Sequence, residues 1–363
     1  MIQVSKIVLS NTLKKVVAFI PRVKTSEYSG IITIIPSKES MKLVLSYPEA
    51  SMESVCQIVN SDGKDSIAAV GGTKLLSMVS VADREILLET DDTSLELTSG
   101  KYKWREPMPS TTNKGIVLPA GDAIEFKIYP LLVALNTVKY AVNSDSIRPS
   151  LYMIDVVDGR VRACNGFQYH EVDTKIKGLT FSLPGGMVDN FIPVLRYLDG
   201  DLKFYSDDDN FYFKNNDDIM SIRRLQLKFP DLDRLLVRPL KSAVPALLQV
   251  NKSELLKALK QVGKIADDNY PYVELHMTQK EVLLRCTSKM GSNVVSQIQG
   301  SWAAKPRVAT FNVKYLLQTV ENLHDGILEI RFGADTKSKK SPLVVEGVGA
   351  WTMLNQMNLS ARA

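Results

Sequence analysis

Three lysines at helical spacing are the residues best placed to do chemistry in this chain. Lys257, Lys260 and Lys264 (i, i+3, i+7) fall within the segment 252–266, which we predict to be a helix. Side chains at this spacing share one face. Apolar residues on the opposite face are Leu255, Leu256, Leu259 and Val262. Ammonium groups in such a row can contact phosphates without reading bases. The pattern itself predicts an amphipathic helix with a basic stripe, for which a solvated helix face is the plainer interpretation.

Residues typical of catalysis are sparse. The only histidines are His170, His276 and His324, and none stands in a pattern that suggests a nucleophile–base pair. The sequence contains no GxxxxGK[ST] phosphate loop, no GxGxxG before a helix and no HExxH. We therefore expect no enzymatic activity and no cofactor.

One acidic region could in principle bind a divalent cation. Asp207-Asp208-Asp209 is followed by Asn215-Asn216-Asp217-Asp218, and such oxygen ligands suit hard cations. The aromatic residues around this region, Phe204-Tyr205 and Phe211-Tyr212-Phe213, alternate as in a β-hairpin. We interpret the acidic residues as solvent-facing turns and predict no metal site.

The composition is that of a folded soluble protein. The 363 residues are 45% hydrophobic and 23% charged, which allows two or three domains. The net charge is only +5, and residues 246–363 carry 15 basic and 10 acidic side chains, so any contact with nucleic acid should be weak and local. Three dispersed cysteines, Cys56, Cys164 and Cys286, favour a reducing compartment. With no long apolar stretch or signal peptide, the sequence predicts a cytoplasmic protein that does not enter membranes.

Three segments of about 120 residues repeat one order of elements, which is the pattern of a repeat architecture. A first helix is predicted at 11–20, 128–142 and 252–266. A strand–turn–strand follows at 31–45, 151–163 and 272–286. A second helix is predicted at 73–81, 187–198 and 313–323, and a closing hairpin at 85–104, 202–225 and 327–353. Breaker-rich stretches at 107–121 and 237–250 separate the repeats. The predicted fold class is α+β, with domains 1–118, 119–245 and 246–363.

Four motifs resemble the bacterial-type sliding clamp, the beta subunit of the replicative DNA polymerase III. These motifs are Ser99–Lys103, Arg162–Gln168, Phe229–Leu235 and Phe311–Leu317. Together with the length and the three repeats, they extend the resemblance over essentially the whole chain. The turn at Phe167-Gln168-Tyr169 differs from the family's histidine-arginine-leucine, and the family's methionine-proline tail is absent. These departures suggest a divergent member, with a phage or mobile element as the candidate source.

The resemblance implies a processivity factor: a ring that encircles double-stranded DNA without sequence preference and tethers partners. Each of the three clamp-type domains would have two helices packed on antiparallel sheets, and the ring would close as a head-to-tail homodimer. The expected contact zones of the dimer are Lys264–Asp268 and Lys74–Met78. Partners would include DNA polymerase and clamp-loader subunits, bound through short peptides with a glutamine and a pair of apolar residues. A peptide-binding module of clamp-like fold that does not encircle DNA is the alternative, left open by Asn136 and Asn143 where lysine might be expected.

The resemblance also assigns two sets of site residues. The peptide pocket, between the second and third domains, would be formed by Cys164, Gly166, Phe167, Gln168, Tyr169, Pro230, Arg234, Leu235, Tyr270, Asn312, Tyr315, Thr352, Leu354 and Gln356. The DNA-contacting residues would be Arg22, Lys24, Lys74, Lys139, Arg148, Arg196, Lys257, Lys260 and Lys264. For each of these residues, an ordinary core position or a solvated surface is the competing interpretation.

Overall fold

The structure, a computed structural model, describes residues 1–20, 30–61, 67–142, 148–231, 246–268, 271–332, 343–347 and 350–354. The chain forms two compact units. Unit 1 comprises residues 1–133 and 178–226, and unit 2 comprises residues 134–177 and 227–363. Each unit thus combines one terminal repeat of the sequence with part of the middle repeat. The boundaries of the three domains stay a prediction.

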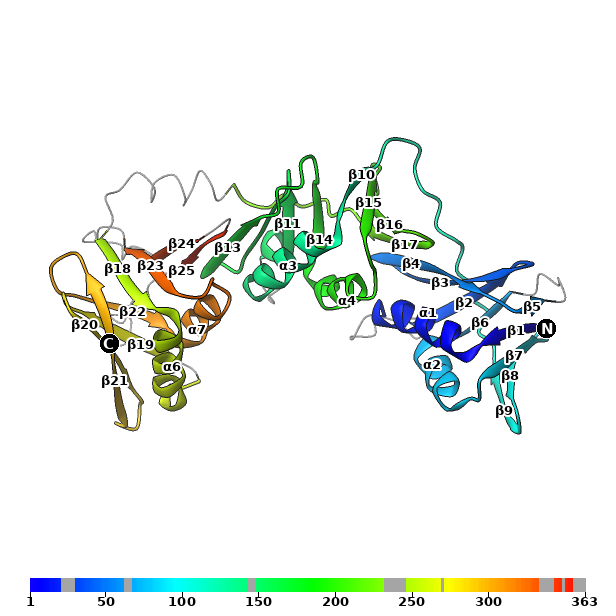
Figure 1. The fold of residues 1–363 in the computed structure, drawn as a ribbon, viewed down its shortest axis with the longest axis horizontal. Coiled ribbons are helices and arrows are strands. Elements are labelled where there is room, and N and C mark those ends of the chain that lie inside the picture. Colours follow the sequence, from blue (N-terminus) through cyan, green and yellow to red (C-terminus); the bar gives the residue numbers. More distant parts are fainter. Residues whose placement is uncertain are drawn as a thin grey trace. The chain divides into compact units, whose positions relative to one another are not determined.

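The order strand, helix, strands, helix, strands occurs three times along the chain (Figure 1). The first repeat contains β1 (Ile2–Ser5), α1 (Lys6–Ala18), β2 (Ile31–Pro36), β3 (Ser40–Tyr47), β4 (Ala50–Gln57), β5 (Asn60–Ser61), β6 (Ala68–Gly71), α2 (Gly72–Val81), β7 (Glu85–Thr90), β8 (Ser94–Ser99) and β9 (Tyr102–Pro107). The second contains β10 (Ile124–Lys127), α3 (Ile128–Val138), η1 (Lys139–Ala141), η2 (Pro149–Leu151), β11 (Met153–Val157), β12 (Arg160–Cys164), β13 (Gln168–Asp173), β14 (Phe181–Pro184), α4 (Gly185–Leu195), β15 (Asp201–Ser206), β16 (Asn210–Asn215) and β17 (Asp218–Arg223). The third contains β18 (Ala246–Asn251), α6 (Lys252–Val262), η4 (Gly263–Ile265), β19 (Tyr272–Met277), β20 (Glu281–Thr287), β21 (Asn293–Trp302), β22 (Arg307–Asn312), α7 (Val313–Glu321), β23 (Ile327–Phe332), β24 (Leu343–Gly347) and β25 (Ala350–Leu354). The predicted threefold repeat is confirmed.

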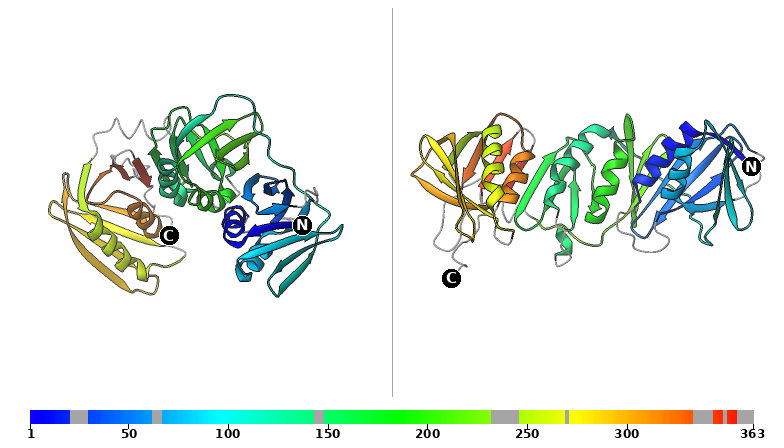
Figure 2. Two further views of the ribbon diagram at one scale, coloured as in Figure 1. Left: turned by 45° about the vertical axis from the view of Figure 1, so that its right-hand side comes forward. Right: turned by 90° about the horizontal axis from the view of Figure 1, so that it is seen from below.

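Unit 1 is built on two antiparallel sheets, with strand orders β5-β1-β7-β8-β9 and β10-β15-β16-β17-β4-β3-β2-β6. The second sheet joins the first two repeats, because β17 pairs with β4 in the register Ile219↔Glu53 to Ile222↔Ala50. Helices α1 and α2 lie side by side against these strands, as both views in Figure 2 show. The apolar faces of sheets and helices therefore meet in a common interior.

Aromatic side chains dominate part of this interior. Phe181 lies 5.0 Å from Phe213 between ring centroids in a T-shaped contact, and Phe191 makes a similar contact with the same ring. Such edge-to-face pairs add to the stabilisation from burial alone. The predicted hairpin is confirmed: the Asp207 carboxylate accepts hydrogen bonds from the backbone of Asp209 and Asn210 at the β15–β16 turn. The prediction that all the acidic turn residues face solvent is wrong, because Asn215 and Asp218 are buried.

Unit 2 contains an antiparallel array in the order β11-β12-β13-β25-β24-β23-β18-β21-β20-β19-β22. Strand β13 pairs with β25, from Gln168↔Leu354 to Val172↔Ala350, and so links the middle and last repeats. Helices α6 and α7 pack together beside the strands of the third repeat (Figure 1). Their apolar faces bury Leu255, Leu259 and Leu316 in the core of the third repeat.

Helix ends were predicted with mixed success. Helix α6 begins at the predicted Lys252, because the Asn251 side chain accepts hydrogen bonds from the backbone N–H groups of Ser253 and Glu254. Helix α1 begins at Lys6 rather than at Asn11, and its preceding residue makes no side-chain cap. Serine is a favoured N-cap residue, so α1 has the sequence signal of a helix start at Ser5 but not the hydrogen bond that α6 makes.

Candidate peptide and phosphate sites

The turn between β12 and β13 carries several of the residues predicted to bind peptides. Asn165 organises it: its Oδ1 accepts hydrogen bonds from the backbone N–H groups of Phe167 (2.9 Å) and Gln168 (2.8 Å). Gly166 has φ +89°, a conformation in which a side chain is strained, and a Cβ there would lie 2.5 Å from Arg148 Nη1. The turn therefore needs glycine, and it brings Arg148, predicted to contact DNA, beside the peptide residues.

Gln168 links this turn to helix α7 and is fully buried. Its Nε2 donates hydrogen bonds to the Tyr315 carbonyl (2.9 Å) and to Thr319 Oγ1 (3.1 Å), while its Oε1 accepts one from Asn165. Asn312 caps α7 by accepting from the backbone N–H groups of Lys314 and Tyr315. Both side chains thus position the wall of the site, and their polar groups are already used within the protein.

An apolar cluster lies next to the turn. Its buried members are Leu151, Cys164, Tyr169 and Met353, and partly buried Phe229 and Val344 pack against it. Burial raises the pKa of the Cys164 thiol, which keeps this thiol neutral and apolar in character. The cluster has the composition expected of a peptide groove floor, apolar with few polar groups.

Leu354 and Met353 occupy opposite faces of β25. Leu354 is fully buried in the core of the third repeat, whereas Met353 belongs to the apolar cluster beside the turn. Alternation along a strand explains the difference. Leu354, predicted to line the peptide pocket, thus lies in the core, whereas Met353, Leu151, Phe229 and Val344 of the cluster were not among the predicted residues.

Phe167, on the turn, and Tyr315, a partly buried residue of α7 that packs on the core of the third repeat, are in contact. Their rings stack with centroids 5.5 Å apart and planes 23° from parallel, although Phe167 is 54% exposed. The pair joins the β12–β13 turn to α7, and Pro230 is half-buried. The remaining predicted peptide residues, Arg234, Leu235, Tyr270 and Gln356, lie outside the described residues. Thr352 is buried and donates a hydrogen bond to the Tyr169 carbonyl.

His170 lies behind the site in a buried polar position. Its Nδ1 is 2.7 Å from the Tyr140 hydroxyl, and its Nε2 has no hydrogen-bond partner among the described residues. Burial lowers the pKa of His170 to about 4 and is the main cause that raises the pKa of Tyr140 to about 12. The imidazole is therefore neutral in the folded protein at neutral pH.

This neutral histidine makes stability depend on pH. The unfolded chain takes up a proton at the ordinary pKa of 6.5, and the folded chain does so only near pH 4. Stability is therefore lost as the pH falls from about 6.5 to about 4, by about 2 kcal/mol at pH 5. Urea denaturation of the wild type and His170→Gln at pH 7.5 and pH 5 tests this. We expect the acid loss to shrink by that amount in the variant, and equal losses in both proteins would contradict the prediction.

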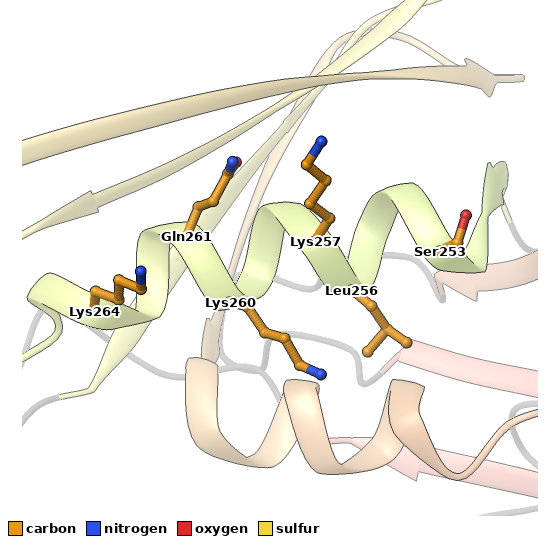
Figure 3. Close-up of a pocket in the computed structure, with 6 residues that line it drawn as sticks. All are labelled: Ser253, Leu256, Lys257, Lys260, Gln261 and Lys264. Atoms are coloured by element: carbon orange, nitrogen blue, oxygen red, sulfur yellow. The ribbon is translucent and has the colours of Figure 1, made fainter.

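Helix α6 carries the second site, an open groove of about 420 Å³ lined by Ser253, Leu256, Lys257, Lys260, Gln261 and Lys264 (Figure 3). All three predicted lysines line it and are exposed. Lys260 and Leu256 extend toward α7, whereas Lys257 and Gln261 extend from the other side of α6. The groove thus offers ammonium groups around an aliphatic floor, which suits a phosphate-bearing ligand.

The other residues predicted to contact DNA differ in their partners and exposure. Lys74 pairs with Glu106 at 2.6 Å, and Lys139 donates a hydrogen bond to Asn136 Oδ1. Arg196 is exposed at the end of α4. Arg22 and Lys24 lie outside the described residues. Of the predicted set in unit 2, Lys257, Lys260 and Lys264 gather in one groove, and Arg148 lies at the peptide turn.

Two absences, of a metal-ligand cluster and of a membrane-spanning helix, hold for the described residues only. No group of three or more His, Cys, Asp or Glu side chains there is arranged to hold a metal ion. No helix there is long and apolar enough to cross a membrane.

This repeated α+β fold is similar to that of the DNA polymerase III beta subunits. A DnaN sliding clamp from Bartonella birtlesii, solved bound to griselimycin, superposes with a TM-score of 0.88 at 17% identity, covering 99% of both chains. The DNA polymerase III beta subunit from Thermotoga maritima gives 0.87 at 18% identity, again with 99% of both chains covered. In sequence, 132 residues are 30% identical to the beta sliding clamp in each of two strains of Helicobacter pylori. That match spans 36% of this chain and about a third of the relatives' length. No family model matches the chain.

The predicted resemblance to bacterial-type sliding clamps and the predicted α+β clamp fold are confirmed. The suggestion of a phage or mobile-element source is untested and stays a prediction. The assignments of individual site residues likewise stay predictions.

Proposed function

We propose that this protein is a DNA polymerase processivity factor that encircles double-stranded DNA and tethers polymerase and clamp-loader subunits through short peptides. The observation that carries the proposal is the match of the whole chain, 99% of its length, to sliding clamps. A ring of this kind holds DNA by topology, so it needs few phosphate contacts. The mild net charge of +5 and the short lysine groove on α6 agree with that requirement.

Assembly as a head-to-tail homodimer of three-domain chains is part of the proposal. A heterologous contact between the first domain of one copy and the third of the other closes a ring by twofold symmetry. Strand β9 supports it, because it is the edge of its sheet in unit 1 and pairs only with β8 among the described strands. Light scattering at micromolar concentration should give a mass near twice 40.4 kDa. A strict monomer would count against ring closure.

Retention on circular DNA tests encirclement directly. Protein loaded onto nicked circular duplex should stay bound through gel filtration and should be released when the circle is linearised, because a ring slides off free ends. Attaching a bulky group to both ends of the linear duplex should restore retention, because the ring can then no longer slide off. Equal retention on open linear and circular DNA would show binding by contacts and would overturn the proposal.

A peptide-binding module that does not encircle DNA is the second candidate. The observation that favours it is on α3, where Asn136 accepts a hydrogen bond from Lys139 and supplies no cation of its own. Such a module would bind the same peptides as the ring and give no retention on circles. We place the protein in the cytoplasm and assign it no catalytic activity under either proposal.

A further inference from the structure

The three lysines of the α6 groove differ in their ion-pair partners. Lys260 Nζ lies 3.0 Å from Glu321 Oε1, at the end of α7. Within the part of the chain that the structure describes, Lys257 and Lys264 have no carboxylate at ion-pair distance. The groove therefore contains one engaged ammonium group and two that face solvent.

Helix geometry separates the same two classes. Lys257 and Lys264 are seven residues apart, so they lie within about 20° of one face and on the order of 10 Å apart along the axis. Lys260 is turned about 60° away from Lys257, and Figure 3 shows it directed toward α7. Lys260, which pairs with Glu321, thus lies to one side of the line that joins Lys257 and Lys264.

Glu321 affects a nearby phosphate in two ways. It holds the Lys260 ammonium on the α7 side, and its own negative charge repels a phosphate that approaches that ammonium. The pair is solvent-exposed, with side chains 58% and 42% accessible, so it adds little to the stability of the fold. Its effect should therefore show in ligand binding and leave folding nearly unchanged.

We propose that Glu321 attenuates DNA affinity by masking Lys260, so that α6 offers two phosphate contacts, from Lys257 and Lys264, in place of three. This inference rests on the proposed function, in which the ligand is the DNA backbone. Keeping the number of contacts low keeps binding weak and mobile, as sliding requires. The Glu321 carboxylate thus limits the affinity of the protein for DNA.

The dependence of duplex binding on salt measures the number of phosphate contacts. The slope of log K against log[salt] is negative, and each contact adds about 0.9 to its magnitude. Titrations of a short linear duplex with the full-length protein should give the following slopes. Lys257→Gln should reduce the magnitude of the slope by about 0.9, Lys260→Gln should leave it unchanged, and Glu321→Gln should increase the magnitude by up to about 0.9. The double variant Glu321→Gln/Lys260→Gln should return to the wild-type slope.

Glu329→Gln is the matched control, because Glu329 is an exposed carboxylate on β23 that accepts a hydrogen bond from Gln249 and lies outside the groove. It changes net charge equally and should leave the slope unchanged. If Glu321→Gln behaves like this control while Lys257→Gln still lowers the slope, masking is wrong and the DNA contact stands. If Lys257→Gln also has no effect, the proposed contact of α6 with DNA is itself wrong.

Discussion

Tyr315→Ala and Phe167→Ala should each weaken binding of a short peptide with a glutamine and a pair of apolar residues at least tenfold. The two rings stack on each other between the β12–β13 turn and α7, and Phe167 is 54% exposed. Removing an aromatic anchor at an interface commonly costs about 2 kcal/mol, more than the 1.4 kcal/mol of a tenfold change. Calorimetry with a polymerase-tail peptide measures the effect.

Controls separate loss of the groove from loss of the fold. Tyr315→Phe keeps the stacked ring and should bind within a few-fold of the wild type. Tyr197→Ala removes an aromatic residue of unit 1 whose exposure, 51%, is close to that of Phe167, and it should leave peptide affinity unchanged. Leu354→Ala should lower the free energy of unfolding by about 2–5 kcal/mol, because that side chain fills the core. Unchanged affinity in both anchor variants would place the peptide site elsewhere.

The helices show what local sequence can predict. Helix α7 begins at the predicted Val313, since Asn312 is a strong cap and the apolar residues that follow recur at helical spacing. In α1 the buried face includes Thr12 beside Leu9, Leu13 and Val16, so the apolar stripe is interrupted by polar residues. Its first turn, with exposed Ile7 and Val8, carries no amphipathic signal. Local rules succeed where caps and periodicity agree and fail where tertiary packing decides.

The site shows what local sequence cannot predict. Whether Met353 or Leu354 faces the groove depends on the register of β25 against β13, where Tyr169 opposes Met353 and Gln168 opposes Leu354. A shift of one residue exchanges the two faces, and nothing local to β25 fixes that register. The same limit explains why Gln168, assigned to the groove, is buried against α7. The motif predicts a site at this turn and strand, whereas the pairing of distant strands decides which way the individual side chains face.

A buried ion pair where the first two repeats join in unit 1 should give the largest stability effect. Lys15 Nζ of α1 lies 2.9 Å and 2.6 Å from the two carboxylate oxygens of Asp218 on β17, which also accepts a hydrogen bond from Ser54 of β4. The side chain of Asp218 is 9% exposed, against 21% for Lys15. Removing one partner of a buried pair costs about 3–5 kcal/mol, since the other charge is left without compensation.

The two single variants should differ, because only lysine can extend toward water. Lys15→Met leaves a buried carboxylate and should cost the full amount, whereas Asp218→Leu should cost less. The double variant Lys15→Met/Asp218→Leu should recover much of the loss, because well-packed apolar groups can replace a buried pair at little cost. Lys14→Met, at the exposed neighbouring position, should stay within about 0.5 kcal/mol of the wild type. Urea denaturation of the wild type, the two single variants at Lys15 and Asp218, and the double variant gives the coupling energy. If the losses of the two single variants simply add in the double variant, the pair is not coupled, and the junction must be held by the β17–β4 pairing and the apolar contacts around it.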